Sequence, residues 1–224
     1  MKPYIICHMM ASVDGRIDCS MTEKMGSEAY YPALECLNCH TLVEGKITNI
    51  MHNCPEGTFK AQNDEPIGHM AWHKAVAADG YHCSVDTHGT LLWDQNTING
   101  LPQLCIISES APKAYAHYLN EKGISWIAAG VHQVDLMQAM EILNAEFGVE
   151  RVAVVGGGHI NGAFLKAGLL DEVSVVIGAA IDGRKGWTSV FDGIEKDDDD
   201  PYHLKLVSVE ICIQDAVWLR YKIS

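Results

Sequence analysis

Three consecutive glycines, Gly156, Gly157 and Gly158, separate an apolar run from a helix-like stretch in "RVAVVGGGHINGAFLKAGLL". A strand that passes through glycines into a helix leaves main-chain N–H groups at the helix N-terminus, where the helix dipole favours an anion. Glycine also lets a phosphate approach the backbone. The pattern lacks the G-x-G-x-x-G spacing and a Walker lysine, so a tight strand-to-helix turn is the alternative to a phosphate site.

Cysteine and histidine side chains form a second set of candidates. "CLNCH" at 36–40 has the C-x-x-C-H spacing of haem attachment, which belongs to exported proteins, and the N-terminus shows no export signal. A zinc site would draw on Cys36, Cys39, His40, His52 and Cys54. Their spacing is unlike that of zinc motifs, and His69 and His73 lack the metalloprotease glutamate. We expect no metal and keep a metal-bearing redox protein as an alternative.

The glycines lie in a chain that alternates apolar runs with helical patterns. Strands are predicted near 4–12, 40–45, 104–108, 125–130, 151–157 and 172–178. Helices are predicted at 27–38 with Ser27 as N-cap, at 111–123 with Pro112 near its start, at 134–148 and at 161–170. Strands that alternate with helices favour an α/β sheet with mostly parallel strands.

The C-terminal part has a different pattern. "YHLKLVSVEIC" and "AVWLRYKIS" alternate polar and apolar residues on either side of "IQD", which predicts an antiparallel hairpin. The segment 52–100 is the least periodic and is predicted to form loops. The acidic run 195–200 is predicted to be a solvated loop. Without a repeat or a linker, we expect one domain, residues 1–224.

Composition restricts the partners. The chain has 224 residues, 48% of them apolar, and a formal net charge of −13. Binding a polyanion requires basic patches, so we expect no nucleic acid or anionic membrane as partner. No run approaches the roughly 20 apolar residues of a membrane span. We expect a cytoplasmic location, with most of the eight cysteines reduced.

Four motifs occur in the order found in one known superfamily. The stretch "VAVVGGGHINGAFLKAGLLDEVSVVI", together with "ASVDGRI" at 11–17, "GKIT" at 45–48 and "CIIS" at 105–108, resembles the dihydrofolate-reductase-like superfamily. The resemblance is closest to the pyrimidine reductases of riboflavin biosynthesis. It implies a three-layer α/β sandwich with a mostly parallel central sheet and an antiparallel C-terminal hairpin.

The resemblance also implies a cofactor, NADPH, laid across the carboxyl ends of the strands. The residues implied to bind it are Ala11, Lys46, Thr48, Ser108, Gly156, Gly157, Gly158, His159 and Ile160. The three glycines, with the amides of His159 and Ile160, would hold the pyrophosphate. Thr48 would donate its hydroxyl to the same phosphates, and Ala11 would let the nicotinamide lie against the first strand. Three of these positions have structural alternatives: Thr48 as an ordinary helix-start residue, Lys46 as a solvated surface lysine and Ser108 as the N-cap of the helix that Pro112 opens.

The adenosine end of the cofactor is implied to lie near Lys46 and Ser108. Members of the superfamily often follow this serine with a basic residue that pairs with the 2′-phosphate. Here Glu109 follows Ser108, and an acid would repel a phosphate but could accept from a free ribose hydroxyl. NADPH is favoured because Lys46 could compensate, and NADH is an alternative.

The part that binds substrate departs from the reductase pattern. Val155 replaces an acid before the glycines, and "ALECLNC" lacks an expected arginine. Lys60 could stand in for one basic group. Loss of charge-assisted contacts makes a less charged substrate possible.

We therefore predict an NAD(P)H-dependent reductase that transfers a hydride to a C=N or C=O of a small, pyrimidine- or pterin-like substrate. Asp14 is the candidate catalytic proton donor, although a local structural role for it is the stronger interpretation. His82, Asp86 and His88 are candidates by polarity alone. The family implies a homodimer. A nucleotide-binding protein of the same fold without turnover is the alternative from another class.

Overall fold

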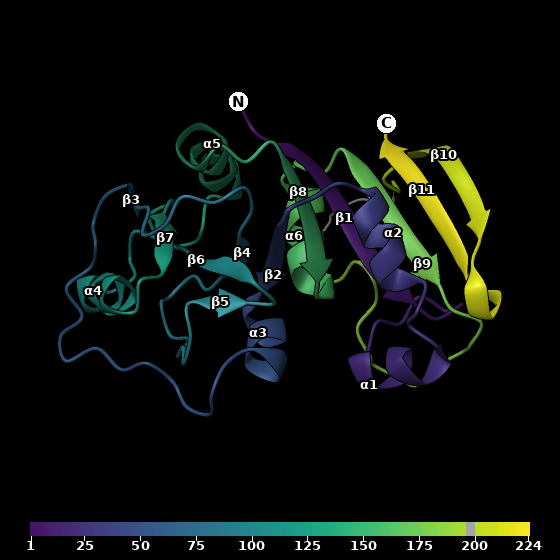
Figure 1. The fold of residues 1–224 in the computed structure, drawn as a ribbon, viewed down its shortest axis with the longest axis horizontal. Helices are drawn as coiled ribbons and strands as arrows, with labels where there is room; N and C mark the ends of the chain where they lie inside the picture. The colour runs from purple at the N-terminus through teal and green to yellow at the C-terminus, as the bar shows by residue number, and fades with distance from the viewer. Residues whose placement is uncertain (196–199) are drawn as a thin grey trace. The chain divides into compact units, whose positions relative to one another are not determined.

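The computed structural model describes residues 1–195 and 200–224 (Figure 1). The chain divides into two compact units. The first unit comprises Met1–Pro3 and His40–Val152, and the second comprises Tyr4–Cys39 and Ala153–Ser224. Of the predicted acidic loop 195–200, residues 196–199 lie outside the described residues. The single domain 1–224 stays a prediction.

The second unit contains five strands in the order β10-β11-β9-β1-β8. They are β1 (Tyr4–Ala11), β8 (Arg151–Gly156, whose first two residues belong to the first unit), β9 (Glu172–Ile177), β10 (Leu204–Ile211) and β11 (Val217–Ile223). β1 and β9 are parallel, whereas β11 is antiparallel to both β9 and β10. The predicted C-terminal hairpin is confirmed, and its turn is a short 3-10 helix, η2 (Ile213–Asp215).

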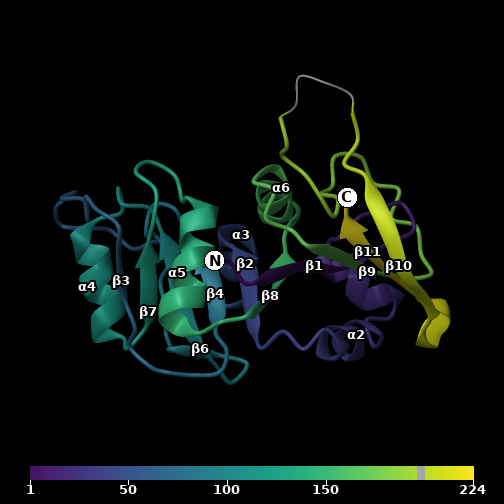
Figure 2. The ribbon, with the colours of Figure 1, turned by 90° about the horizontal axis from the view of Figure 1, so that it is seen from above.

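The helices of the second unit lie on both faces of its sheet. They are α1 (Cys19–Thr22), η1 (Glu23–Met25), α2 (Tyr30–Cys36) and α6 (Gly158–Lys166). Figure 2 shows α2 and α6 on opposite sides of β1 and β9. Ala33 of α2 packs against Ile6, Val176 and Trp218 in a buried apolar cluster. The prediction of Ser27 as N-cap is wrong: the N-cap is Ala29, and Ser27 offers only its carbonyl to the amide of Tyr30.

The first unit contains strands in the order β2-β4-β6-β7-β3, with β5 paired to β6. They are β2 (Thr41–Gly45), β3 (Ala71–His73), β4 (His82–Val85), β5 (Thr97–Ile98), β6 (Leu101–Ile107) and β7 (Ser125–Ala128). β2, β4, β6 and β7 are parallel, and β3 is antiparallel to β7. The segment 52–100, which the sequence predicts to hold loops, also contains three short strands, of which β4 is fully buried.

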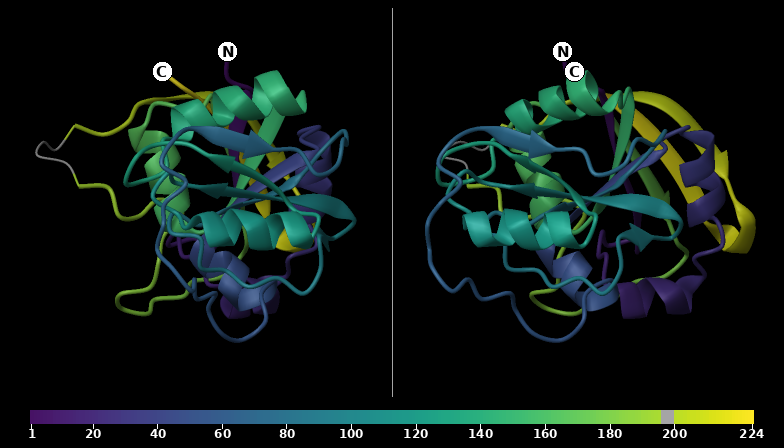
Figure 3. Two further views of the ribbon diagram at one scale, coloured as in Figure 1. Left: turned by 90° about the vertical axis from the view of Figure 1, so that its left-hand side faces the viewer. Right: turned by 60° about the vertical axis from the view of Figure 1, so that its left-hand side comes forward.

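Three helices cover this sheet: α3 (Lys46–His52), α4 (Lys113–Glu121) and α5 (Leu136–Phe147). Figure 3 shows α4 and α5 on opposite faces. The predicted glycine ends are confirmed, because Gly123 and Gly148 have φ of 69° and 74°. Pro112 is the N-cap of α4, so Ser108 does not cap it. Within residues 1–195 and 200–224, every helix is too short or too polar to cross a bilayer.

A buried histidine links β1 to the neighbouring strands of the second unit. The His8 ring contacts the Ser174 hydroxyl at 2.9 Å and the Tyr30 carbonyl at 3.2 Å. The Trp218 indole N–H donates to the same Ser174 hydroxyl at 2.7 Å. The Tyr30 carbonyl can only accept, so Nε2 carries the proton and Nδ1 accepts from Ser174. Burial lowers the pKa of His8 from its ordinary 6.5 to about 4, although the bond to Tyr30 opposes this.

Because of buried His8, we expect the free energy of unfolding to fall in acid. The lowered pKa means that the unfolded chain takes up a proton which folded His8 refuses, so its contribution to stability is complete above pH 6.5 and is lost as pH falls towards 4. The full difference is about 3 kcal/mol. Urea unfolding at pH 7, 5.5 and 4.5 measures it. His8→Gln should show a flatter pH dependence than wild type, and equal slopes would contradict the assignment.

Candidate functional site

The glycine turn joins β8 to α6 in the second unit. β8 ends at Gly156, whose φ is 142°, and α6 begins at Gly158. Gly157 is the N-cap, with φ −86° and ψ −169°, and provides no side-chain cap. The amides of Gly158, His159 and Ile160 are the first three of a nine-residue helix and have no intrahelical acceptor. The predicted strand–glycine–helix arrangement is present, and it is suited to an anion.

Gly158 lacks a side chain for a reason that the sequence did not reveal. A Cβ on Gly158 would lie 2.3 Å from the Ser189 carbonyl oxygen, and one on Gly162 would lie 2.2 Å from the Asp192 carbonyl oxygen. Residues 187–194, which we call the strap, therefore lie directly on the backbone of α6. The chain itself thus occupies the side-chain direction of Gly158, which requires glycine there whether or not a phosphate binds the Gly158 amide. Two glycines four apart on one helix face were the signal for this packing.

Hydrogen bonds attach the strap to α6. The amide of Asn161 donates from Nδ2 to the Val190 carbonyl at 2.7 Å, and the Asp192 N–H donates to the Gly158 carbonyl at 3.1 Å. Asn161 is fully buried, and within the described residues its Oδ1 has no hydrogen-bond partner. The strap also reaches the "ASVDG" motif, because the Val190 N–H donates to the Gly15 carbonyl at 3.2 Å. The strap thus connects the two motifs.

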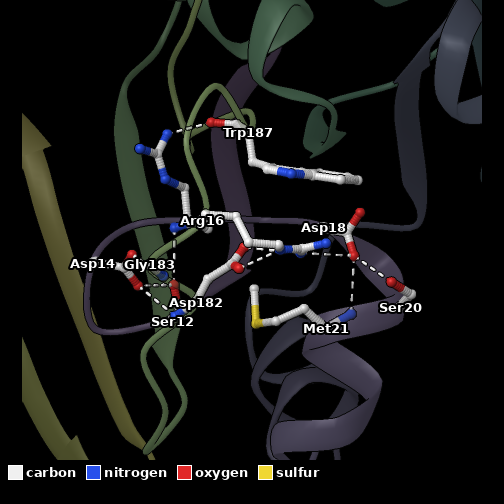
Figure 4. Close-up of polar contacts among 10 residues, drawn as sticks. Ser12, Asp14, Arg16, Asp18, Ser20, Met21, Asp182, Gly183 and Trp187 are labelled. Atoms are coloured by element: carbon white, nitrogen blue, oxygen red, sulfur yellow. Dashed lines mark hydrogen bonds and ion pairs between the residues drawn. The ribbon is translucent and has the colours of Figure 1, made fainter.

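Asp14 organises the loop after β1. Its carboxylate accepts from the Ser12 hydroxyl at 2.6 Å and from the amides of Asp182 and Gly183 at 3.0 and 2.9 Å (Figure 4). The Ser12 hydroxyl, followed by the two amides, holds the pKa of Asp14 well below its ordinary value. An exposed carboxylate that stays ionised is a poor proton donor. The contacts of Asp14 therefore favour a structural role over catalytic proton transfer.

Arg184 forms a further polar group beside this loop. Its guanidinium binds both carboxylate oxygens of Asp182, lies 3.4 Å from the Asp18 carboxylate and stacks 3.9 Å from the Trp187 ring centre. Asp182 raises the pKa of Arg184, and the Ser20 hydroxyl is the main cause that lowers the pKa of Asp18. Figure 4 shows Asp18, Asp182 and Trp187 together. The sequence does not reveal this group, because its members lie in two loops far apart along the chain.

Ala11 and Lys46 occupy different units. Ala11 is the buried last residue of β1 and pairs with Ile177 of β9. Lys46 opens α3; its ammonium donates to the Thr90 hydroxyl and lies 3.7 Å from the carboxylate of fully buried Asp86. Asp86 therefore offsets part of the positive charge of Lys46, which was expected to pair with a 2′-phosphate. Thr48 is the third residue of α3 and is half-buried.

The predicted serine at the end of β6 also has internal partners. The Ser108 hydroxyl, fully buried, donates to the Thr87 carbonyl at 2.8 Å and lies 2.8 Å from the Ser110 hydroxyl. The Glu109 N–H donates to the Gly130 carbonyl at 2.8 Å, and its side chain is half-buried. Lys60 is exposed on the first unit.

The remaining proton-donor candidates have different surroundings. His82 is buried, with Nε2 3.4 Å from the Glu44 carboxylate. The Asp86 carboxylate accepts from the amides of Thr90 and Leu91, and His88 is exposed. Within residues 1–195 and 200–224, no three His, Cys, Asp or Glu side chains converge as metal ligands.

Comparison with known proteins bears on these predictions. A family model described as "RibD C-terminal domain" matches residues 3–218. The 2,5-diamino-6-ribosylamino-4(3H)-pyrimidinone 5′-phosphate reductase of Methanothermobacter thermautotrophicus is 28% identical over 200 residues, which cover 86% of this chain and 85% of the relative.

Solved structures are similar at lower identity. A pyrimidine reductase-like protein from Corynebacterium diphtheriae has a TM-score of 0.72 at 17% identity, with 99% of this chain and 92% of that chain covered. Acinetobacter baumannii RibD has a TM-score of 0.68 at 16% identity, with 100% and 58% covered. The shared fold and the family model confirm the predicted α/β fold, the superfamily resemblance and the prediction of a reductase. Since the family model spans nearly the whole chain, the protein belongs to the RibD C-terminal domain family.

Proposed function

We propose that the protein is an NADPH-dependent reductase of riboflavin biosynthesis whose substrate is a ribosylaminopyrimidine 5′-phosphate. The observation that carries the cofactor assignment is the glycine turn, which presents the amides of Gly158, His159 and Ile160 at the start of α6. The substrate class is taken from the relative that is named a pyrimidinone 5′-phosphate reductase. Val155 and the exposed Lys60 are the positions where substrate contacts are expected to differ from the family pattern.

The chain's own residues would hold and orient the reactants. The α6 amides would bind the pyrophosphate, and Ala11, which has no side chain beyond Cβ, would let the nicotinamide lie against β1. When bound, the cofactor supplies the hydride from its C4 carbon to a C=N or C=O carbon. Asp14 and Ser12 would keep the loop after β1 ordered beside this carbon. Thr48, Lys46 and Ser108 are proposed as further cofactor contacts.

The cofactor preference is expected to be modest. Lys46 is the proposed contact of the 2′-phosphate, but buried Asp86 lies 3.7 Å from its ammonium, and Glu109 adds a negative charge. We expect NADPH to bind more tightly than NADH by less than about tenfold, which corresponds to about 1.4 kcal/mol. Separate titrations followed by nucleotide fluorescence measure both affinities. A difference of about 1,000-fold would contradict this charge balance.

Turnover tests the function as a whole. The 2,5-diamino- and 5-amino-6-ribosylaminopyrimidine 5′-phosphates should each be tested with NADPH, following loss of absorbance of the reduced nicotinamide. Oxidation that depends on a pyrimidine supports the proposal. Saturable NADPH binding without oxidation by either compound would instead favour a nucleotide-binding protein without turnover. A cytoplasmic location and a homodimer, both implied by the family, are kept as proposals.

A further inference from the structure

A surface pocket of the first unit, which we call the α4 pocket, contains none of the residues implied to bind the cofactor. Residues of α4, of β7 and of the segment that leads into β3 line it (Figure 2). They are Ile67, His69, Ala71, Lys113, Ala116, His117, Asn120 and Trp126. The pocket has a volume of about 240 Å³. This is just below the range for drug-sized ligands, so the pocket suits a molecule of one or two fused rings.

The α4 pocket has an aromatic side chain beside small ones. The four lining residues of α4 follow the i, i+3, i+4, i+7 pattern of one helix face. Trp126 of β7 is only 8% exposed, and Ala71 and Ala116 leave room next to it. The Trp126 indole N–H donates to Oδ1 of Asn120 at 2.8 Å. Because this polar group already has its partner, the ring offers the pocket an apolar surface on which a planar ring can stack.

Two of the four polar side chains of the pocket are paired with carboxylates that do not line it. The Lys113 ammonium forms an ion pair with Glu65. Nε2 of His117 lies 3.3 Å from the Glu121 carboxylate, one helical turn away. These carboxylates offset the positive charge of both groups, so the pocket is not suited to an anion in particular.

The other two polar side chains each keep one hydrogen-bonding atom without a partner among the described residues. Oδ1 of Asn120 accepts from Trp126, so the Nδ2 group is a free donor. Nδ1 of His69 lies 2.9 Å from the Ile67 carbonyl, which can only accept. Nδ1 therefore carries the proton of the neutral ring, and Nε2 is a free acceptor. The pocket thus combines an aromatic surface with one donor and one acceptor.

We propose that the α4 pocket binds a planar heteroaromatic ring that carries a hydrogen-bond acceptor and a donor on one edge, as a nucleobase does. The ring would stack on Trp126, and the Asn120 amide would donate to a ring nitrogen. An exocyclic amine would donate to Nε2 of His69. The proposal does not depend on reductase activity, because the eight lining residues lie outside the glycine turn and the loop after β1.

The fluorescence of 2-aminopurine tests this proposal. The probe carries an amine next to a ring nitrogen, and stacking on an aromatic ring quenches its emission. We expect saturable quenching with a Kd of about 1 mM or below. Purine lacks the amine and should compete at least about threefold more weakly, because one hydrogen bond is lost. No saturable quenching up to about 10 mM, or equal competition by purine, would overturn the proposal.

Asn120→Asp removes the donor and keeps the oxygen that accepts from Trp126. The variant should weaken 2-aminopurine binding at least about fivefold, because a ring nitrogen would then face a carboxylate. Lys122→Gln is the matched control: it changes the net charge equally, at the exposed C-cap of α4 and outside the pocket. Its affinity should stay that of wild type. Equal losses in the two variants would refute the role of Asn120.

Three further variants locate the bound probe. Ala116→Leu fills the pocket and should abolish the quenching, whereas unchanged quenching in a variant that melts cooperatively would refute the site. His69→Phe, at an exposed position, gives a test that does not depend on core packing: without the acceptor, purine and 2-aminopurine should compete equally. Gly157→Asp changes the other unit and should leave the quenching unchanged. Loss of quenching in that variant would place the probe at the proposed cofactor site and overturn the assignment.

Discussion

Gly157→Asp is expected to abolish NADPH binding and leave the fold intact. Gly157 is the N-cap of α6 with φ −86°, a backbone conformation that any residue adopts. Aspartate is a favourable N-cap residue, and its charge suits the helix dipole, so the helix itself should not be weakened. The carboxylate would stand where we propose that the pyrophosphate binds. Like charges in contact cost several kcal/mol, so affinity should fall at least about 100-fold.

The variant Gly157→Asn distinguishes the effect of a negative charge on NADPH affinity from the effect of side-chain size. Asparagine has the shape of aspartate and caps helices about as well, but it carries no charge. The asparagine variant should therefore retain measurably more affinity than the aspartate variant, with both melting near the wild-type temperature. Fluorescence titration of NADPH and a thermal melt of each variant give the two readouts. Unchanged affinity in a folded Gly157→Asp protein would remove the glycine turn from the cofactor site.

The elements with long, regular patterns could be predicted from the sequence. The strand before the glycines, the helix ending at Gly148 and the C-terminal hairpin all have apolar periodicity and clear turn residues, and the structure contains them. β4 was missed because only four residues, "HCSV", form it, and two of them are polar. A short strand buried by its neighbours carries too little pattern of its own. Ser27 was wrongly predicted for a related reason: serine is a favourable N-cap residue, but α2 begins two residues later, with Ala29 as its N-cap.

The sequence predicted the segments that form the candidate site, but it did not predict the contacts that their side chains make. The motif order identified the loop at Asp14 and the glycine turn, and the family model agrees with that resemblance. The sequence could not show that the Lys46 ammonium binds next to Asp86, 40 residues away along the chain, or that Ser108 bonds Thr87. Such pairings depend on which strands are neighbours. Residue type alone therefore suggested free ligands where the structure shows side chains with internal partners.

Gly158→Ala should destabilise the protein even though alanine is the better helix former. The new Cβ would meet the Ser189 carbonyl oxygen at 2.3 Å and the Thr188 methyl at 2.6 Å, and a backbone carbonyl cannot move without displacing the strap. Overpacking of this kind costs about 2 kcal/mol, more than the roughly 1 kcal/mol that alanine gains over glycine in a helix interior. The expected fall in thermal midpoint is about 4–8 °C before that gain and about 2–4 °C after it.

The segment in which hydrogen exchange accelerates distinguishes a local clash at Gly158 from global unfolding. If the strap is displaced, the Val190 N–H loses its bond to the Gly15 carbonyl, so hydrogen exchange at Val190 should accelerate before exchange in β9 does. Gly162→Ala meets the Asp192 carbonyl at 2.2 Å and should act alike, whereas Lys166→Ala, at an exposed position of the same helix, should not. A Gly158→Ala protein as stable as wild type would mean that the strap does not rest on α6. NADPH affinity should fall less than in Gly157→Asp, because the amides that face the phosphates keep their charge environment.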